Sequence, residues 1–303
     1  MNFLSITDIN VSKVLSLAKA VKENPPTYAH ALKHKALAAI FEKSSTRTKL
    51  SFQLAVLQMG GYYIELGGAH LLNGHEDAHD TANSIAQYAD FLLARVNSHS
   101  SLEALAAHSP IPVINALSNL EHPCQALADL LTISESKGLH KTKLAYIGDS
   151  NNVSNSLLLA CALTGLEIAI ASPANYGPSK SIIKKASEVA NNGFTVNRTN
   201  KPPEAAADAD VVYTDAWVSM GQENEAEQKL KAFKGFQITQ ELMECAKPDA
   251  IFMHCLPAHK GLEVAPDVIE GPQSAVFQQA ANRLHVQKAV LLMLSNPKPG
   301  VNA

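Results

Sequence analysis

The sequence predicts an α/β protein made of two doubly wound parallel-sheet domains joined by long helices. Short apolar runs alternate with helix-like stretches, which is the pattern of a parallel sheet with crossover helices. The alternation starts twice, near residue 36 and again near residue 143. With 303 residues, the chain is also longer than one ordinary domain of about 100 to 200 residues.

Composition restricts the class of function. Hydrophobic residues make up 46% of the chain and charged residues 17%, which is too apolar for a disordered protein. The net charge of -3 provides no basic surface for a nucleic acid or an anionic membrane. The four cysteines form no C-x-x-C pair, and neither a signal peptide nor an apolar run of about 18 residues is present. We therefore expect a cytoplasmic protein that acts on small molecules, without nucleic-acid or membrane partners.

Eight apolar runs are predicted as strands. In the first domain they are ALAAIF (36–41), YYIEL (62–66), FLLARV (91–96) and PVINAL (112–117). In the second domain they are KLAYIGD (143–149), EIAIAS (167–172), DVVYTD (210–215) and AIFMHC (250–255). Residues 191–204 and 220–236 are predicted to have little regular structure.

Two long helix-like segments connect the domains. The first, 124–138, ends at Gly138. The second, 276–295, is amphipathic, and we expect it to pack back on the first domain. The predicted domains are therefore residues 1–135 with 276–303, and residues 136–275.

The polar stretch FEKSSTRTKLSF (41–52) joins the first strand to a helix with leucines on one face. Ligands of open α/β sheets bind beyond the carboxyl ends of the strands, where helix N-termini also point. Ser44–Thr48 bring hydroxyl groups, one guanidinium and unpaired N–H groups there, although the P-loop pattern is absent. This is typical of an anion cradle. The structural alternative is that Ser45 only caps the helix and Arg47 lies on the surface.

Two further strand ends favour the anion cradle. Arg95 lies in an otherwise apolar run, where an arginine needs a partner. Glu121–Gln125 place an imidazole and a carboxamide at the start of the next helix. Taken alone, His122 fits a structural cap better than a catalyst. Together, the three strand ends predict a site for a phosphate and a polarised carbonyl group.

The second domain offers a different set of groups. Gly148–Asn152 stand where a dinucleotide-binding fold has G-x-G-x-x-G, and the glycines that a pyrophosphate requires are missing. This disfavours a dinucleotide oxidoreductase and favours a small polar ligand. Asp215 ends a strand and precedes the loop 216–221. The amino group of a ligand can pair with the Asp215 carboxylate, and its α-carboxylate can accept hydrogen bonds from the N–H groups of the loop.

His254–His259 follow the last predicted strand. Cys255 by itself is most simply a small buried hydrophobe. His254 and His259 offer metal-binding nitrogens, but no third ligand follows at zincin spacing, so we predict no metal. Trp217 is interpreted as a packing residue.

Together, these motifs resemble the ornithine carbamoyltransferases, a branch of the aspartate/ornithine carbamoyltransferase superfamily. The matching blocks cover nearly the whole chain in the family's order. The blocks Phe41–Thr48 and His122–Gln125 are typical of the superfamily. The block Ser219–Gly221, called the Ser-Met-Gly block, is typical of the ornithine branch. The blocks are Phe41–Thr48, His122–Gln125, Asp215 with Ser219–Gly221, His254–Pro257 and Asn282–Leu284.

The resemblance implies that the first domain binds carbamoyl phosphate and the second L-ornithine, without a cofactor. It also implies a homotrimer, or a higher assembly of trimers, with active sites at subunit interfaces. The implied carbamoyl phosphate ligands are Ser45, Thr46, Arg47, Thr48, Arg95, His122, Pro123, Cys124, Gln125, Cys255, Leu256 and Arg283. The implied ornithine ligands are Asn152, Asp215, Ser219 and Met220, and the implied catalytic residues are Arg47, Arg95, His122, Asp215 and Cys255.

The implied reaction yields citrulline and phosphate, in arginine metabolism. The δ-amine of ornithine attacks the carbamoyl carbon while Arg47, Arg95 and His122 stabilise the oxyanion, with no covalent intermediate. With a lysine-like pKa near 10.4, freeing the amine at pH 7 costs roughly 4 to 5 kcal/mol. Cys255, Asp215 and the leaving phosphate are the candidate proton acceptors. Positioning both substrates contributes up to about 7 to 11 kcal/mol.

Two positions depart from the family's pattern. Leu72, beside Asn73, stands where the family uses a glutamine that reaches a neighbouring subunit's site. Ala281 stands where the family often has a glutamate near Arg283.

Several alternatives stay open at the level of the sequence. Putrescine, acetylornithine or lysine can replace ornithine as the acceptor, although the Ser-Met-Gly block argues against the first two. An aspartate acceptor calls for more cationic groups in the second domain. A non-catalytic binding paralogue is disfavoured because Arg47, His122, Asp215 and Cys255 are all present.

Overall fold

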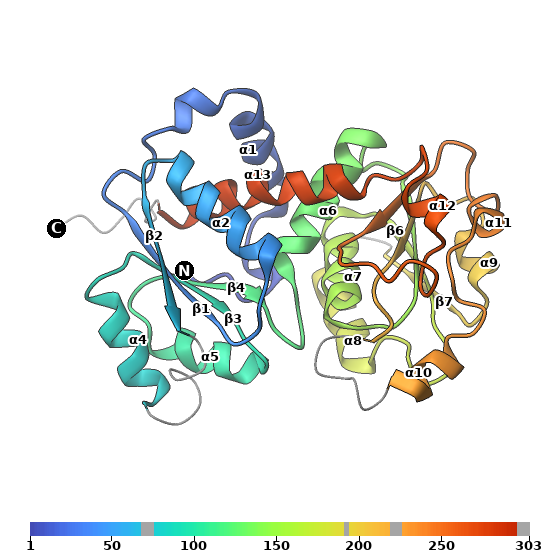
Figure 1. The fold of residues 1–303 in the computed structure, drawn as a ribbon, viewed down its shortest axis with the longest axis horizontal. Helices are drawn as coiled ribbons and strands as arrows, with labels where there is room; N and C mark the ends of the chain where they lie inside the picture. The colour runs from blue at the N-terminus through green and yellow to red at the C-terminus, as the bar shows by residue number, and fades with distance from the viewer. Residues whose placement is uncertain (68–75, 191–193, 219–225, 296–303) are drawn as a thin grey trace. The chain divides into compact units, whose positions relative to one another are not determined.

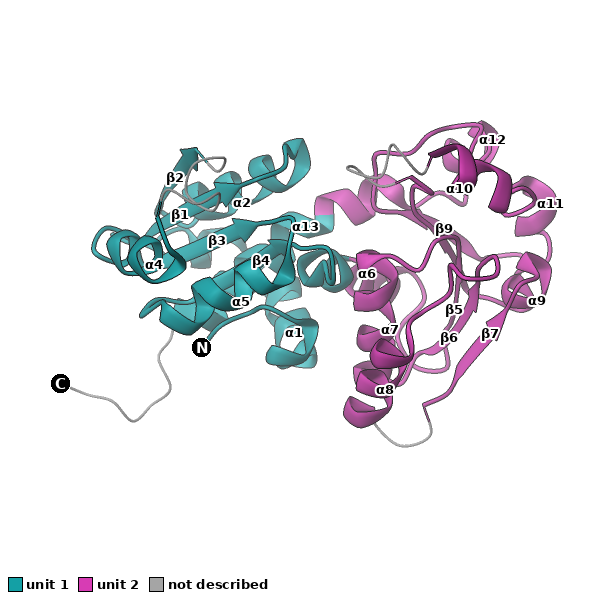
Figure 2. Cartoon of the chain, turned by 90° about the horizontal axis from the view of Figure 1, so that it is seen from below, with its two compact units in different colours: residues 1–128, 282–303 teal, residues 129–281 magenta. Residues whose placement is uncertain are grey.

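The computed structural model describes residues 1–67, 76–190, 194–218 and 226–295 (Figure 1). The chain divides into two compact units, unit 1 with residues 1–128 and 282–303, and unit 2 with residues 129–281 (Figure 2). Helices α6 (Pro123–Ser136) and α13 (Val276–Ser295) each contribute residues to both units. Within these described ranges, no helix combines the length and the apolar character that crossing a membrane requires.

Unit 1 contains a four-stranded parallel sheet in the order β2-β1-β3-β4. All four strands predicted for the first domain are present. Its strands are β1 (Ala36–Phe41), β2 (Tyr62–Gly67), β3 (Phe91–Arg95) and β4 (Val113–Leu117). Its helices before α6 are α1 (Val11–Glu23), α2 (Thr46–Gln58), α4 (Ala78–Ala86) and α5 (His99–His108), with short 3-10 turns at Ile6–Asp8 and Pro25–Tyr28.

Helices cover both faces of the unit 1 sheet, which explains why β1 and β3 read as continuous apolar runs. Helices α4 and α5 pack on one face, where Ile85 and Leu102 join the core. Helices α2 and α13 lie on the other face (Figure 1). Lys288 of α13 donates a hydrogen bond to Gln58 of α2 at 2.6 Å. The C-terminal helix therefore packs back on the first unit, as the sequence predicts.

Helix α2 buries a face that its leucines do not mark. The sequence places leucines on one face of this helix but does not say which face packs on the sheet. In the structure, α2 buries Phe52, Ala55 and Val56, and it leaves Leu50 and Leu57 more than half exposed, at 55% and 52%. The helix is apolar on two sides, and periodicity alone does not say which side faces the sheet.

Unit 2 contains a five-stranded parallel sheet in the order β7-β6-β5-β8-β9. Its strands are β5 (Lys143–Ile147), β6 (Glu167–Ala171), β7 (Val196–Thr199), β8 (Val211–Thr214) and β9 (Ile251–His254). Its helices, besides parts of α6 and α13, are α7 (Asn152–Thr164), α8 (Lys180–Val189), α9 (Pro202–Ala206), α10 (Ala226–Ala232), α11 (Gln240–Met243) and α12 (Pro266–Ile269).

The prediction of little regular structure at 191–204 and 220–236 is wrong in part. Strand β7 and helix α9 form in the first stretch, and helix α10 forms in the second. Strand β7 is a sheet edge whose middle residues, Asn197 and Arg198, are polar and exposed. Its stability comes from hydrogen bonds to β6 rather than from an apolar pattern, so periodicity does not reveal it.

The core of unit 2 includes Trp217, which stacks on Phe233 with ring centroids 5.4 Å apart. This confirms its interpretation as a packing residue. Close by in the chain, Lys229 of α10 is buried and pairs with Asp149, at the end of β5, at 2.5 Å. The ion pair holds α10 against the end of β5, the strand that precedes the polar stretch 148–152.

Candidate active site

In unit 1, the predicted site residues gather where the direction of chain winding reverses. Strand β1 is followed by β2 on one side and has β3 on its other side, and ligands of doubly wound sheets bind at such a switch point. Helix α2 begins there. Its N-cap is Ser45, whose hydroxyl accepts the N–H of Thr48 at 3.3 Å. Ser45 therefore caps the helix, and Arg47 is half-buried rather than a surface residue.

Arg283 of α13 connects the predicted residues of three elements. Its guanidinium is buried, with 3% of the residue exposed. Its Nη1 donates to Gln125 Oε1 at 2.5 Å, and its Nη2 donates to Thr48 Oγ1 at 2.7 Å. These charge-assisted bonds fix the first turns of α2 and α6 against α13.

His122, just before α6, lies inside a cluster of cationic side chains. Burial lowers the pKa of its imidazole well below its usual value, and the charges of Arg283, Arg95 and Arg47 lower it further. The imidazole is therefore neutral near pH 7. Its Nε2 lies 3.5 Å from Nη1 of Arg283, which has no lone pair to offer, so Nε2 is the accepting nitrogen of any bond there.

The remaining predicted residues of unit 1 lie close in the chain to this cluster. Arg95 ends β3, pairs in register with Phe41 and is 5% exposed. Pro123 and Cys124 form the first turn of α6, whereas Thr46 is exposed at the start of α2. Burial raises the pKa of the Cys124 thiol to about 12, which keeps it protonated and unreactive.

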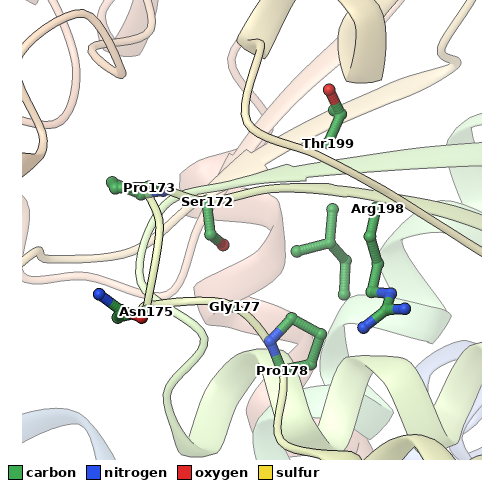
Figure 3. Close-up of a pocket in the computed structure, with 8 residues that line it drawn as sticks. Ser172, Pro173, Asn175, Gly177, Pro178, Arg198 and Thr199 are labelled. Atoms are coloured by element: carbon green, nitrogen blue, oxygen red, sulfur yellow. The ribbon is translucent and has the colours of Figure 1, made fainter.

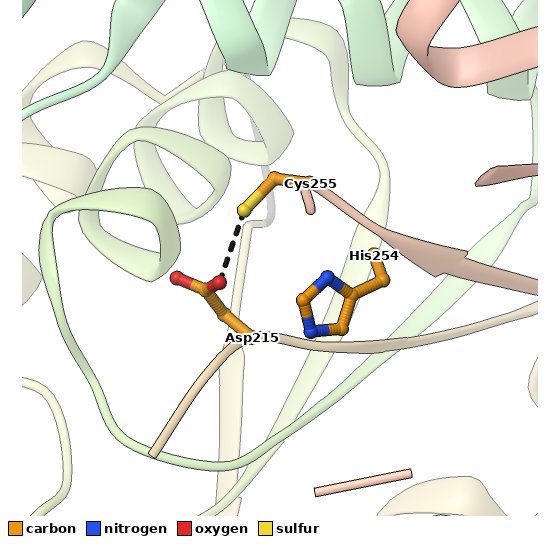
Figure 4. Close-up of side chains that lie close together, drawn as sticks. All are labelled: Asp215, His254 and Cys255. Atoms are coloured by element: carbon orange, nitrogen blue, oxygen red, sulfur yellow. Dashed lines mark hydrogen bonds between the residues drawn. The ribbon is translucent and has the colours of Figure 1, made fainter. Parts of the chain in front are cut away.

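In unit 2, the switch point lies between β5 and β8, and Asp215 follows β8 there. The residue is 9% exposed. One carboxylate oxygen, Oδ1, accepts from the Cys255 thiol at 3.0 Å (Figure 4). It also accepts from the Ala216 N–H at 2.8 Å. The other oxygen, Oδ2, accepts from Asn151 Nδ2 at 2.6 Å. The structure thus brings together Asp215 and Cys255, which the sequence predicted, and adds Asn151.

The backbone after β9 has an uncommon conformation. Leu256 has a left-handed φ of 58°, which is rare for a residue with a branched side chain. Its N–H donates to Nδ1 of the buried His254 at 2.8 Å. On the opposite side of that ring, Nε2 lies 3.5 Å from the buried carboxylate of Glu263. His254 and Glu263 thereby support the turn that carries Cys255 and Leu256.

Asp215, His254 and Cys255 each offer a ligand atom within 4.8 Å of the others, close enough to share a metal ion (Figure 4). The sequence pattern pointed to His254 with His259 instead, because Asp215 is distant from both in the chain. Hydrogen bonds already occupy Nδ1 of His254 and join the Cys255 thiol to Asp215. We therefore treat the cluster as a hydrogen-bonded one.

The remaining predicted site residues are Asn152, Ser219 and Met220. Asn152 is the first residue of α7, next to Asn151. Ser219 and Met220 lie outside the described residues, as do Leu72 and Asn73.

Three residues of these contacts were not predicted from the sequence: Asn151, Gln279 and Asp129. Asn151 belongs to the polar stretch 148–152, so a signal was present, but its side-chain partner is 64 residues away. Gln279 accepts the His254 N–H at 3.0 Å and donates to the buried Asp129 at 2.7 Å. Both lie within helical patterns, which give no signal for such contacts.

A separate hollow of about 310 Å³ lies at the carboxyl ends of β6 and β7 (Figure 3). Ile170, Pro178 and Arg198 are among the residues that line it, and the predicted site residues are not. It is one strand away from the switch point between β5 and β8, so we assign no substrate to it.

Comparison with known proteins gives consistent results for both parts of the chain. The family described as aspartate/ornithine carbamoyltransferase matches over residues 1–135 with its carbamoyl-P binding domain and over residues 140–294 with its Asp/Orn binding domain. The ornithine carbamoyltransferase of Archaeoglobus fulgidus is 47% identical over 300 residues, covering 97% of each chain. That of Anoxybacillus flavithermus is 48% identical over 302 residues, covering 97% of this chain and 96% of the relative. The solved structure of the Pyrococcus furiosus ornithine carbamoyltransferase superposes with a TM-score of 0.93 at 44% identity, covering 98% of both chains.

Proposed function

The chain belongs to the aspartate/ornithine carbamoyltransferase family, and we propose that it transfers the carbamoyl group of carbamoyl phosphate to the δ-amine of L-ornithine. The products are L-citrulline and phosphate. The observation that carries this proposal is the neutral, buried His122 among the guanidinium groups of Arg47, Arg95 and Arg283. Such a cluster is complementary to a phosphate dianion beside a carbonyl oxygen that becomes negative during attack.

We assign carbamoyl phosphate to the domain of residues 1–135 with 276–303. The free N–H groups at the start of α2, together with Arg47, hold the phosphate, and Arg95 and His122 face the carbamoyl oxygen. Arg283 orients Gln125 and Thr48 through its two hydrogen bonds. The further ligands of this substrate are Ser45, Thr46, Pro123, Cys124, Cys255 and Leu256.

We assign L-ornithine to the domain of residues 136–275. Its amino group pairs with the Asp215 carboxylate, which the hydrogen bonds from Cys255 and Asn151 orient. Asn152, Ser219 and Met220 complete the ornithine site. An acidic anchor of this kind suits an amino group rather than the second carboxylate of an aspartate acceptor.

The reaction forms one C–N bond and breaks one C–O bond. The lone pair of the δ-amine attacks the carbamoyl carbon, and the carbonyl electrons move onto the oxygen that Arg47, Arg95 and His122 stabilise. When the carbonyl re-forms, the bond to the phosphate oxygen breaks and phosphate leaves with the electron pair. The amine loses one proton, for which Cys255, Asp215 and the departing phosphate are the acceptors within the proposed site.

We also propose that the protein is a homotrimer. The support is a set of exposed apolar side chains at the outer edge of the sheet, on α2 and on the edge strand β2, which we call the α2–β2 face. Edge strands with exposed apolar side chains require a covering partner. The large side chains exposed there are Leu50, Leu54, Leu57, Tyr62 and Ile64, with exposures of 36% to 60%. The four free cysteines fit a reducing cytoplasm, where we place the enzyme in arginine biosynthesis.

The proposed function is tested by offering the purified protein carbamoyl phosphate with each amine in turn. The amines are ornithine, putrescine, acetylornithine, lysine and aspartate, and the carbamoylated product of each is measured. We expect rapid product formation with ornithine alone. Preference for another amine would contradict the assignment of the second domain, and no product with any amine would support a non-catalytic protein.

A further inference from the structure

We propose that Asn151 is a positioning residue, which holds the Asp215 carboxylate in the orientation that the acceptor amine requires. The inference rests on the proposed function, because it concerns the residue assigned to the amine. Asn151 follows β5 and Asp215 follows β8, and these strands are neighbours in the sheet, with Leu144 paired to Val211. The two side chains therefore meet at the switch point itself.

The hydrogen bonds of Asn151 determine which way its carboxamide points. As the N-cap of α7, its Oδ1 accepts the N–H groups of Val153 at 2.9 Å and Ser154 at 3.2 Å. With Oδ1 facing the helix, Nδ2 is the atom that faces Asp215, and it donates to Oδ2 at 2.6 Å. One side chain thus caps a helix and tethers a carboxylate.

The backbone of Asn151 is held as firmly as its side chain. Its N–H donates to the Asp149 carbonyl at 2.9 Å, and its carbonyl accepts the Ser154 hydroxyl at 2.9 Å. Asp149 in turn pairs with the buried Lys229 at 2.5 Å. The donor to Asp215 therefore stands on a rigid base, which is what a positioning residue needs.

The hydrogen bond from Asn151 limits the rotation of the Asp215 carboxylate. An ionised carboxylate has about four acceptor positions. Cys255 and Ala216 use two positions on Oδ1, and Asn151 uses one on Oδ2. The remaining position on Oδ2 has a defined direction because the other three bonds prevent the carboxylate from turning. Without Asn151, only Oδ1 keeps a hydrogen-bond donor among the described residues.

Two substitutions separate the tether from the helix cap. Asn151→Ser keeps a good N-cap but is too short to reach Asp215. Asn151→Asp keeps the cap and the shape but replaces the donor with an acceptor. Asn10→Ser is the matched control, because Asn10 caps α1 by accepting the Lys13 N–H in unit 1. All three variants and the wild type are assayed for citrulline formation and for thermal unfolding.

We expect Asn151→Ser to lower kcat/KM for ornithine on the order of 10²-fold, since small displacements of a reacting pair cost about that much. Its KM for carbamoyl phosphate and its unfolding midpoint should change no more than those of the Asn10→Ser control. In Asn151→Asp, two facing carboxylates raise the pKa of one of them, so the acid limb of the kcat/KM profile for ornithine should move to higher pH.

The outcomes distinguish this inference from the proposed function. If the wild type forms no citrulline, the proposed function fails, and the role of Asn151 fails with it. If the wild type is active and Asn151→Ser retains its kcat/KM for ornithine, only the inference is overturned. In a third outcome, both Asn151 variants lose activity in proportion to a lowered unfolding midpoint, and the pH profile does not move. Asn151 would then act only as a helix cap, and the inference would be overturned.

Discussion

His122 shows how a single residue links burial to the pH dependence of stability. Its folded pKa lies well below the ordinary 6.5 because of burial and three neighbouring arginines. Below pH 6.5, the imidazole takes up a proton in the unfolded chain but not in the folded chain. The free energy of unfolding therefore falls by about 1.4 kcal/mol for each pH unit. We expect His122→Asn to abolish this loss. Urea unfolding of both proteins between pH 7 and pH 5 measures it, and a stability difference independent of pH would contradict it.

The environment of Gln287 leads to a prediction about stability. This residue is fully buried on α13, and neither atom of its carboxamide has a hydrogen-bond partner among the described residues. An unsatisfied buried polar group costs about 1 to 3 kcal/mol, so we expect Gln287→Leu to stabilise the protein by roughly that amount. Chemical denaturation measures the change.

Gln279, on the same helix, is the matched control for Gln287. It is equally buried but bonds to Asp129, Tyr213 and the His254 N–H. Gln279→Leu should therefore destabilise the protein by about 1 to 3 kcal/mol, because it removes three buried hydrogen bonds, including the acceptor of the His254 N–H. If the two substitutions change stability in the same direction, hydrogen bonding does not account for the difference between them.

At the scale of elements, helix α7 is defined at both ends by its sequence. Asn151 caps its start, and Gly165 ends it in the left-handed region with a φ of 75°. An added Cβ at Gly165 would meet no other atom within 4 Å, so only the backbone conformation opposes substitution. We expect Gly165→Ala to cost about 1 kcal/mol and Gly165→Asn less, as Asn tolerates this region. Urea midpoints with unchanged m-values measure both, and equal stability of all three proteins would contradict the prediction.

Element by element, the sequence predicts the strands that are buried on both faces and misses the edge. Strands β1 and β5 have almost no exposed residue, and a sheet covered on both sides demands continuous apolar runs. Strand β7 is polar and short, and only its register with β6 makes it a strand. Helix α2 was predicted, but which of its two apolar sides faces the sheet was not.

At the scale of the whole molecule, the α2–β2 face predicts an assembly. Leu57 is 52% exposed there, and a charge at this position would be buried without a partner in a subunit interface. We expect Leu57→Lys to convert a trimer into monomers, as measured by light scattering after size-exclusion chromatography. Phe277→Lys is the control, since Phe277 is 80% exposed in unit 2, outside this face. A wild type that is monomeric, or a Leu57→Lys variant that stays trimeric, would contradict the assignment.

The sequence by itself determined the two doubly wound sheets, the returning C-terminal helix and the family, because apolar periodicity and contiguous motifs such as Ser44–Thr48 are local properties of the chain. Only the tertiary structure decided how the side chains are paired. Arg283 reaches Thr48 across 235 residues of chain, and Asn151 reaches Asp215 across 64. Such contacts depend on sheet order and on which helix face is buried, and neither is encoded in the spacing of residues within one segment.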